Sequence, residues 1–189
     1  MTDVGVPEAR GTEAAAQPLL VVTAGLPATG KSTIAEVVGN RLGLPVLSVD
    51  PIEAAILSAG IDSAQPTGLA AYLVAETMAE GVLASGRGVV IDAVNAVEPA
   101  RDQWVKLAAR QDATLRFIEV ICSDPEVHRE RLAARAGRHA KTGTAYAVEQ
   151  SLEEWEPWGG DSAAVARVTL DSVQPLGVNI EQALAFLES

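Results

Sequence analysis

The chain has 189 residues, 48% of them hydrophobic, and carries 14 basic against 25 acidic side chains, for a net charge of −11. This length suits one folded domain, or one domain with a small appendage, and the apolar content excludes a disordered composition. The acidic balance disfavours nucleic acids and anionic membranes as main partners. No stretch of the sequence stays apolar over the roughly 20 residues that a membrane helix needs.

The only cysteine, Cys122, has no partner for a disulfide within the chain, which indicates a reducing, cytoplasmic setting. Residues 1–18 are rich in Gly, Ala, Pro and Glu and lack the basic-then-apolar pattern of a secretion signal. We therefore expect a loose N-terminal tail over residues 1–18 and a folded domain over residues 19–189.

From residue 19 onward, short apolar runs alternate with segments of helical periodicity. The apolar runs predict strands at residues 19–24, 45–49, 89–92, 114–121 and 165–170. The periodic segments predict helices at 31–42, 52–59, 69–85, 98–111, 124–136, 146–155 and 178–188, with a mobile segment at 137–145. Apolar strands separated by helices are typical of a three-layer α/β protein, in which helices cover both faces of a parallel sheet. Ligands of such sheets bind beyond the carboxyl ends of the strands.

The first predicted strand and the first predicted helix are joined by a glycine-containing loop that fits the pattern G-x-x-x-x-G-K-[ST]. Its residues are Gly25, Leu26, Pro27, Ala28, Thr29, Gly30, Lys31, Ser32 and Thr33. Glycines permit the backbone angles that turn successive N–H groups toward phosphate oxygens, the lysine supplies a positive charge, and the serine hydroxyl suits Mg²⁺. A plain strand-to-helix turn is the alternative, but the pattern is rare by chance and its flanks are correct. We predict that residues 25–33 bind the phosphates of a nucleotide.

Two aspartates follow predicted strands and should reach the same edge of the sheet. Asp92 comes directly after Val89–Ile91 and could hold Mg²⁺ together with Ser32, although an ordinary turn aspartate is the alternative. Asp50 is expected at the end of the second strand, where it could cap the next helix or accept a proton from a substrate hydroxyl. We predict that Asp50 is catalytic, as a general base rather than a metal ligand.

The predicted helix 124–136 carries His128, Arg131 and Arg135 on one face, because their spacing is i, i+3 and i+7. Arginines at this position could grip the oxygens of a transferring phosphoryl group. The alternative is a solvated face that pairs with Glu126 and Glu130. We predict a catalytic role for Arg131 and Arg135 and assign none to His128.

Taken together, these motifs resemble those of the small P-loop kinases, most closely the AAA_33-like ATP-binding kinases. Chloramphenicol phosphotransferase, zeta toxin, gluconate kinase and shikimate kinase are more distant members of the same group. The resemblance covers residues 19–188 and rests on residues 25–33, Val49-Asp50, residues 86–93, Arg131 with Arg135, residues 155–158 and residues 170–172. Within residues 155–158, Trp155 and Trp158 could wall a pocket or pack in the core or a hinge.

The resemblance implies a P-loop NTPase fold whose five-stranded parallel sheet has the order 2-3-1-4-5, with a lid segment that closes over the nucleotide. It implies that ATP, with Mg²⁺, donates its γ-phosphoryl group to the hydroxyl of a small molecule, with Lys31 acting alongside the residues named above. Residues 52–84 would form the acceptor side, and residues 170–175 would lie near the adenine. Ala28 stands where these kinases usually have glycine, so we expect a small local adjustment of the backbone there.

The acceptor itself is left open between a metabolite and an antibiotic. The few charges on the predicted acceptor-side helices, Asp62, Glu76 and Glu80, favour a neutral or cationic acceptor over a polyanion. Two alternatives remain, a toxin-like kinase of nucleotide sugars and a nucleotide-gated binding or ATPase module without a small-molecule acceptor. A guanine-specific switch is disfavoured because the sequence has neither NKxD nor DxxG. Either a monomer or a homodimer is compatible with the sequence.

Overall fold

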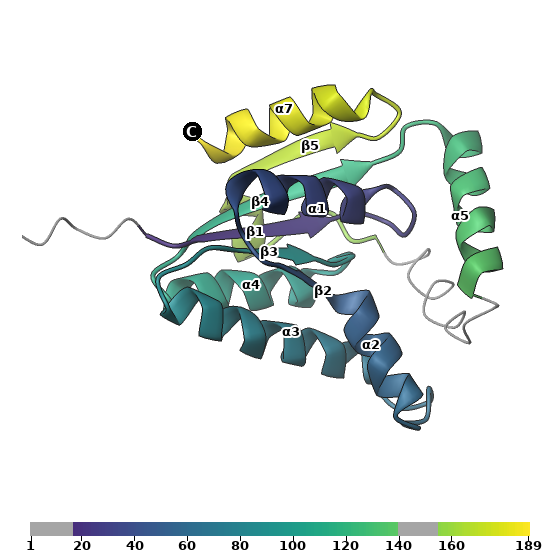
Figure 1. Ribbon diagram of the computed structural model, residues 1–189, viewed down its shortest axis with the longest axis horizontal. Helices are drawn as coiled ribbons and strands as arrows, with labels where there is room; N and C mark the ends of the chain where they lie inside the picture. Colours follow the sequence, from purple (N-terminus) through teal and green to yellow (C-terminus); the bar gives the residue numbers. More distant parts are fainter. Residues whose placement is uncertain (1–16, 140–154) are drawn as a thin grey trace, which may run out of the picture.

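The structure is a computed structural model that describes residues 17–139 and 155–189. Its strands form one parallel sheet in the order β2-β3-β1-β4-β5, which confirms the order that the resemblance implied (Figure 1). The strands are Leu19–Ala24 (β1), Val46–Ser48 (β2), Val89–Asp92 (β3), Thr114–Ile121 (β4) and Arg167–Asp171 (β5).

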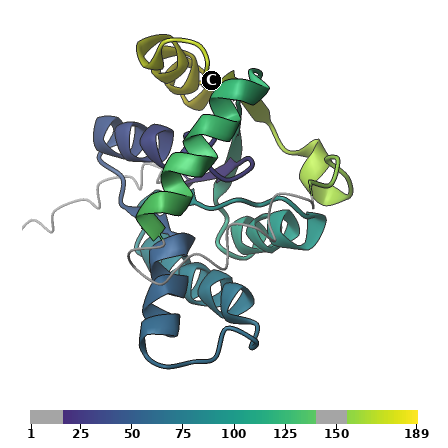
Figure 2. The same ribbon diagram turned by 90° about the vertical axis from the view of Figure 1, so that its right-hand side faces the viewer.

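Helices cover both faces of the sheet, as expected for three layers. They are Lys31–Leu42 (α1), Val49–Ser58 (α2), Thr67–Ala84 (α3), Glu98–Arg110 (α4), Pro125–His139 (α5) and Leu176–Leu187 (α7), with a short 3₁₀ turn at Asp161–Ala164 (η1). One layer contains α1 and α7, the opposite layer contains α3 and α4, and α5 crosses the edge toward which the strands point (Figures 1 and 2). Within the described ranges, every helix is too short or too polar to cross a membrane.

The core lies on both sides of the sheet, because successive residues of a strand point to opposite faces. Leu20 and Val22 of β1 pack toward the α3 and α4 layer, where Trp104 is fully buried. Val21, between them in sequence, packs toward α1 and α7. Burial on both faces explains why β1 is an unbroken apolar run rather than an alternating one.

Several predicted boundaries differ from the observed ones by one to three residues, and two of these differences concern α2 and α5. Helix α2 begins at Val49 rather than Ile52, so Asp50 lies in the first turn of that helix and not at the end of a strand. Pro51 does not prevent this start, because the N–H of a residue in the first helical turn has no intrahelical partner to lose. Helix α5 continues to His139, three residues beyond its predicted end.

Other sequence predictions fall on residues that the structure does not describe. The predicted helix 146–155 and most of the segment 137–145 lie outside the described residues, except that Trp155 is described and is not helical. Residues 1–16 of the predicted tail also lie outside them. The last residue of the predicted tail, Pro18, already belongs to the sheet region, because the Pro18 carbonyl accepts a hydrogen bond from the N–H of Thr114 at 2.9 Å.

A buried polar network fixes the loop that follows β3. Asn95 is fully buried at a φ of 48°, and its side chain donates to the Thr23 carbonyl at 2.7 Å while accepting from the Trp104 indole N–H at 2.9 Å. Its own N–H donates to the Tyr72 hydroxyl at 3.0 Å. Because every one of these groups is satisfied away from water, the network holds the carboxyl ends of β1 and β3 in one arrangement.

The same loop is tied to residues 155–158 by a buried arginine. Arg101 is fully buried, and its guanidinium lies 4.9 Å and 4.4 Å from the ring centroids of Trp155 and Trp158. Trp158 also packs edge-on against Phe117 at 5.0 Å between ring centroids. Trp158 therefore packs against the core, as one of the two interpretations held, whereas Trp155 is half-buried against the Arg101 guanidinium. The guanidinium donates to the backbone carbonyls of Asn95, Ala96, Glu156 and Pro157.

We expect the substitution Asn95→Ala to lower the free energy of unfolding by about 2–4 kcal/mol, because the buried Trp104 N–H and Thr23 carbonyl lose their partner. Gln103→Ala is the matched control, since it removes one hydrogen bond of 3.1 Å from a half-buried amide to the Tyr72 carbonyl. Urea denaturation measures both changes. Equal losses of unfolding free energy in the two variants would show that the buried network stabilises the fold no more than the half-buried hydrogen bond of Gln103 does.

Candidate nucleotide site

The loop between β1 and α1 starts from a position that only glycine can occupy. Gly25 has a φ of 144°, and a Cβ built on it would lie 2.2 Å from the carbonyl oxygen of Val120 on β4. Its N–H donates to the Val94 carbonyl at 2.9 Å. The loop is thus held between β4 and the segment after β3, and a larger residue would displace its backbone.

One carbonyl organises the interior of the loop. The Leu26 oxygen accepts hydrogen bonds from the Thr29 N–H at 3.3 Å, from the Thr29 hydroxyl at 2.9 Å and from the Lys31 ammonium at 2.8 Å. Lys31 is 6% exposed, so this contact fixes a positive charge inside the loop. An incoming anion would meet an ammonium group that is already in place.

The loop also presents a row of N–H groups. Within the part of the chain that the structure describes, the backbone N–H groups of Ala28, Gly30, Lys31, Ser32 and Thr33 have no hydrogen-bond partner. The last three belong to the first turn of α1, where the helix dipole adds a partial positive charge. We call these five groups the phosphate seat, because they can bind an anion in the way that helix N-termini do.

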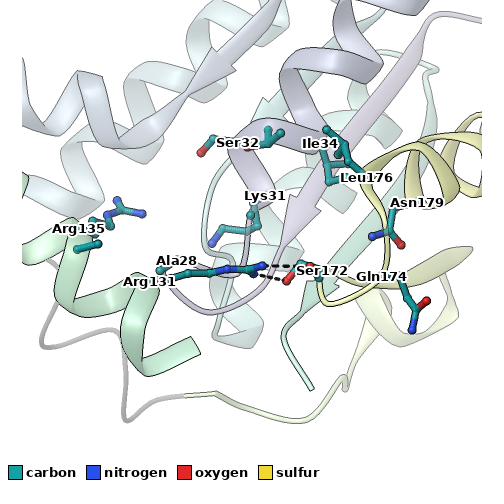
Figure 3. Close-up of a pocket in the computed structure, with 13 residues that line it drawn as sticks. Ala28, Lys31, Ser32, Ile34, Arg131, Arg135, Ser172, Gln174, Leu176 and Asn179 are labelled. Atoms are coloured by element: carbon teal, nitrogen blue, oxygen red, sulfur yellow. Dashed lines mark hydrogen bonds between the residues drawn. The ribbon is translucent and has the colours of Figure 1, made fainter. Parts of the chain in front are cut away.

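A cavity of about 550 Å³ opens onto the phosphate seat. Figure 3 shows that its lining comes from the loop and α1, from α5, and from the segment after β5 together with the start of α7. Its volume is within the range of small-molecule sites. The lining residues are Ala28, Gly30, Lys31, Ser32, Thr33, Ile34, Arg131, Ala134, Arg135, Ser172, Gln174, Leu176 and Asn179. Of the nine predicted loop residues, Gly25, Leu26, Pro27 and Thr29 lie behind this surface and support it.

The ammonium of Lys31 is easier to deprotonate than usual. Burial lowers its pKa to about 8, although the carboxylates of Asp92 and Asp50 oppose the shift; the Arg135 charge lowers it further. Lys31 is therefore mostly charged at pH 7, but its pKa lies closer to that pH than the pKa of an exposed lysine does.

Asp92 ends β3, as predicted, and is 8% exposed. Its carboxylate accepts a hydrogen bond of 3.0 Å from the hydroxyl of Ser48 at the end of β2. Ser32 lines the cavity, whereas Asp92 does not. Among residues 17–139 and 155–189, no three His, Cys, Asp or Glu side chains form a metal site of their own. These residues fit Mg²⁺ only if phosphate oxygens complete its coordination, as in P-loop proteins.

The polar face of α5 points toward the site. Arg131 donates to the Ser172 hydroxyl at 2.7 Å and to the Ser172 carbonyl at 3.2 Å (Figure 3). Arg135 forms an ion pair with Asp50, whose side chain is half exposed. Glu126 instead pairs with Arg129 on the solvent side. The structure thus brings together the arginines and the aspartate that sequence reasoning selected.

Sequence reasoning missed two contacts at the site. The imidazole Nε2 of His128 lies 2.8 Å from the carbonyl oxygen of Pro27 in the loop. The Ser48 hydroxyl supports Asp92 from the neighbouring strand. The position of His128 on the same helical face as Arg131 and Arg135 was the one signal that could have indicated the first contact.

Ala28 has a backbone conformation that is unusual for alanine. Its φ is 63°, in the left-handed region that its glycine counterpart would favour. The loop therefore holds an alanine in a strained conformation.

This geometry defines a class of protein. A parallel sheet of order 2-3-1-4-5 with a G-x-x-x-x-G-K-S loop after β1 is the fold of the P-loop nucleoside triphosphate-binding proteins. The chain belongs to the AAA_33 family, described as an AAA domain, whose model matches residues 20–157. It is 30% identical over 153 residues to the uncharacterised protein Rv2004c of Mycobacterium tuberculosis. That match covers 72% of this chain, and the chain spans only about 30% of the length of that relative.

Solved structures share the fold. A gluconokinase from Sinorhizobium meliloti matches with a TM-score of 0.63 and 24% identity, over 91% of this chain and 93% of the other. The APS kinase CysC of Mycobacterium tuberculosis, solved with AMPPNP and APS, matches with a TM-score of 0.67 and 19% identity, over 92% and 99%. At these identities the likeness shows that the chain has the fold of P-loop kinases.

We expect Ala28→Gly to raise the free energy of unfolding by about 1 kcal/mol, because glycine adopts a positive φ without the steric cost that alanine carries. Thermal and urea unfolding measure the gain. Ala134→Gly, in α5, is a control in the opposite direction, since glycine weakens a helix by roughly 1 kcal/mol. A loss of stability in Ala28→Gly would show that the left-handed φ is not a source of strain.

We expect nucleotide binding to weaken above pH 8, by up to tenfold per pH unit, because the free protein must then regain the Lys31 proton in order to bind phosphate. Titration with a fluorescent, non-hydrolysable ATP analogue between pH 7 and pH 9.5 measures this. Lys31→Arg should bind more weakly but with a flat profile, since arginine stays charged over this range. The same slope in both proteins would assign the titration to another group.

Proposed function

We propose that the protein is an ATP-dependent kinase that transfers the γ-phosphoryl group to a hydroxyl of a small molecule, a metabolite or an antibiotic. The observation that carries the proposal is the phosphate seat beside the buried Lys31 ammonium, which opens onto a cavity edged by two arginines. Binding of an ATP-type nucleotide agrees with the AMPPNP in the related APS kinase. The N–H groups of residues 28–33 would hold the phosphates by the mode common to P-loops.

On the phosphate side, we infer separate roles for the cationic residues. Lys31 would contact the β- and γ-phosphates from within the loop, and Arg131 and Arg135 would offset the charge that moves to the transferred group. Ser32 and Asp92 would hold Mg²⁺, which neutralises phosphate charge when bound. Ser172, the partner of Arg131, lies on the segment that we expect near the adenine, so Arg131 links the phosphate and base ends of the cavity.

On the acceptor side, Asp50 is the proposed general base. Its carboxylate is exposed enough to meet a substrate, and in this structure it pairs with Arg135. A phosphate bound at the seat would compete for Arg135, because its charge exceeds that of one carboxylate. Asp50 would then be released to accept the proton of the acceptor hydroxyl while that oxygen attacks the γ-phosphorus, the bond to the β,γ-bridging oxygen breaks and ADP leaves.

The charges near Asp50 favour a neutral or cationic acceptor. Residues 42–86, which contain β2, α2 and α3, include no Lys, Arg or His. Glu76 and Glu80, which the sequence suggested for the acceptor, instead interact with Arg110 and Gln111 around α4. The acidic side chain left near Asp50 on α2 is Glu53, which accepts a hydrogen bond from Thr67 at 2.8 Å.

The test is a coupled ADP-release screen over hydroxyl compounds in neutral, amino and phosphorylated sets. We expect Lys31→Ala to lose nucleotide binding and turnover. Asp50→Asn should keep nucleotide affinity within about threefold but lose roughly a hundredfold or more in kcat on the acceptor found. Glu53→Gln is the matched control and should retain most of the turnover.

Other outcomes would select another function. Turnover in Asp50→Asn equal to that of the unsubstituted protein would contradict the base assignment. Activity confined to nucleotide sugars would favour the toxin-like kinase. ATP hydrolysis that no acceptor accelerates would favour a nucleotide-gated module.

A further inference from the structure

The helix α5 makes a direct contact with the backbone of the phosphate loop through a residue that has no role in the proposed chemistry. The Nε2 of His128 lies 2.8 Å from the carbonyl oxygen of Pro27, and the imidazole is half-buried. A carbonyl oxygen can only accept a hydrogen bond, so Nε2 carries the proton in this contact. The contact spans 101 positions of sequence and joins α5 to the loop.

The contacted carbonyl belongs to a tight turn. The Thr29 N–H donates to the Leu26 carbonyl at 3.3 Å, Pro27 occupies the second position, and Ala28 occupies the third with a φ of 63°. A positive φ at the third position and proline at the second define a type II turn. Type II turns favour glycine at the third position, whereas alanine favours the type I turn.

The two turn types differ mainly by a flip of the central peptide, here the bond between Pro27 and Ala28. This peptide is trans and planar, so the Pro27 carbonyl and the Ala28 N–H point in opposite directions. The carbonyl points to His128, and the N–H is one of the five groups of the phosphate seat. A flip to type I would break the contact with His128 and turn this N–H away from the seat.

We propose that His128 is a positioning residue that selects the type II form of the turn Leu26–Thr29 and thereby keeps the Ala28 N–H directed toward bound phosphate. The inference rests on the proposed binding of a nucleoside triphosphate at this loop. It explains why the loop can keep an alanine at a left-handed φ, since strained conformations persist only where surrounding contacts determine them.

The test uses two substitutions that separate hydrogen bonding from packing. The side-chain amide nitrogen of glutamine is as many bonds from Cα as Nε2 of histidine, while that of asparagine corresponds to Nδ1. The probe is a fluorescent, non-hydrolysable ATP analogue with Mg²⁺, and thermal unfolding of each variant is measured alongside.

We expect His128→Gln to bind the analogue within about twofold of the unsubstituted protein. His128→Asn should bind it about three- to tenfold more weakly, the range for loss of one hydrogen bond. Ala28→Gly favours the type II turn without the contact to His128. In that background, His128→Asn should weaken binding of the analogue by less than about twofold. Rescue by glutamine and by glycine at position 28 together would support the turn-selecting role.

Four results would overturn the inference. Equal affinities in all variants would show that His128 does not position the loop, and the proposed nucleotide site would stand. Equal losses in the Gln and Asn variants, or a loss that Ala28→Gly leaves unchanged, would assign His128 to packing. Lack of binding by the unsubstituted protein would instead contradict the proposed function, and this inference with it.

Discussion

The phosphate loop can offer its N–H groups to an anion only because other groups hold it from behind. Gly25 is fixed between the Val94 and Val120 carbonyls, and the Leu26 carbonyl gathers three donors. These contacts use the N–H groups of Gly25 and Thr29 and the Leu26 carbonyl, and they leave the five N–H groups of the phosphate seat open. An anion therefore binds to donors that are already oriented, which avoids the cost of ordering them at the moment of binding.

The helix α5 connects three separate parts of the structure around the cavity. Arg131 contacts the segment after β5 (Figure 3), His128 contacts the loop, and Arg135 contacts Asp50 on α2. These residues share one helical face, so the helix cannot rotate or shift without changing all three contacts. Under the proposed function, occupation of the phosphate seat and the pairing of Asp50 would therefore be linked through this one helix.

The distribution of cationic side chains suits the binding of an anion in the cavity. The chain is acidic overall, yet Lys31, Arg131 and Arg135 line a single cavity. The Lys31 ammonium is buried, and burial both strengthens its field and lowers its pKa. The buried Arg101 has a different use, since its donors are occupied by backbone carbonyls that tie two loops together. Cationic side chains thus face the cavity at one place and tie two loops together at another.

The sequence by itself determined the parallel sheet, the loop that can bind phosphate and the positions of Lys31 and Asp92. Each of these follows from the order of residues along a short stretch, through strand burial, helix periodicity or the special backbone freedom of glycine. Only the tertiary structure decided that Asp50 belongs to a helix and meets Arg135, and that Trp158 packs on Arg101. These contacts join residues that lie 57 to 85 positions apart, and local patterns carry no information about which distant side chain will fill a given space.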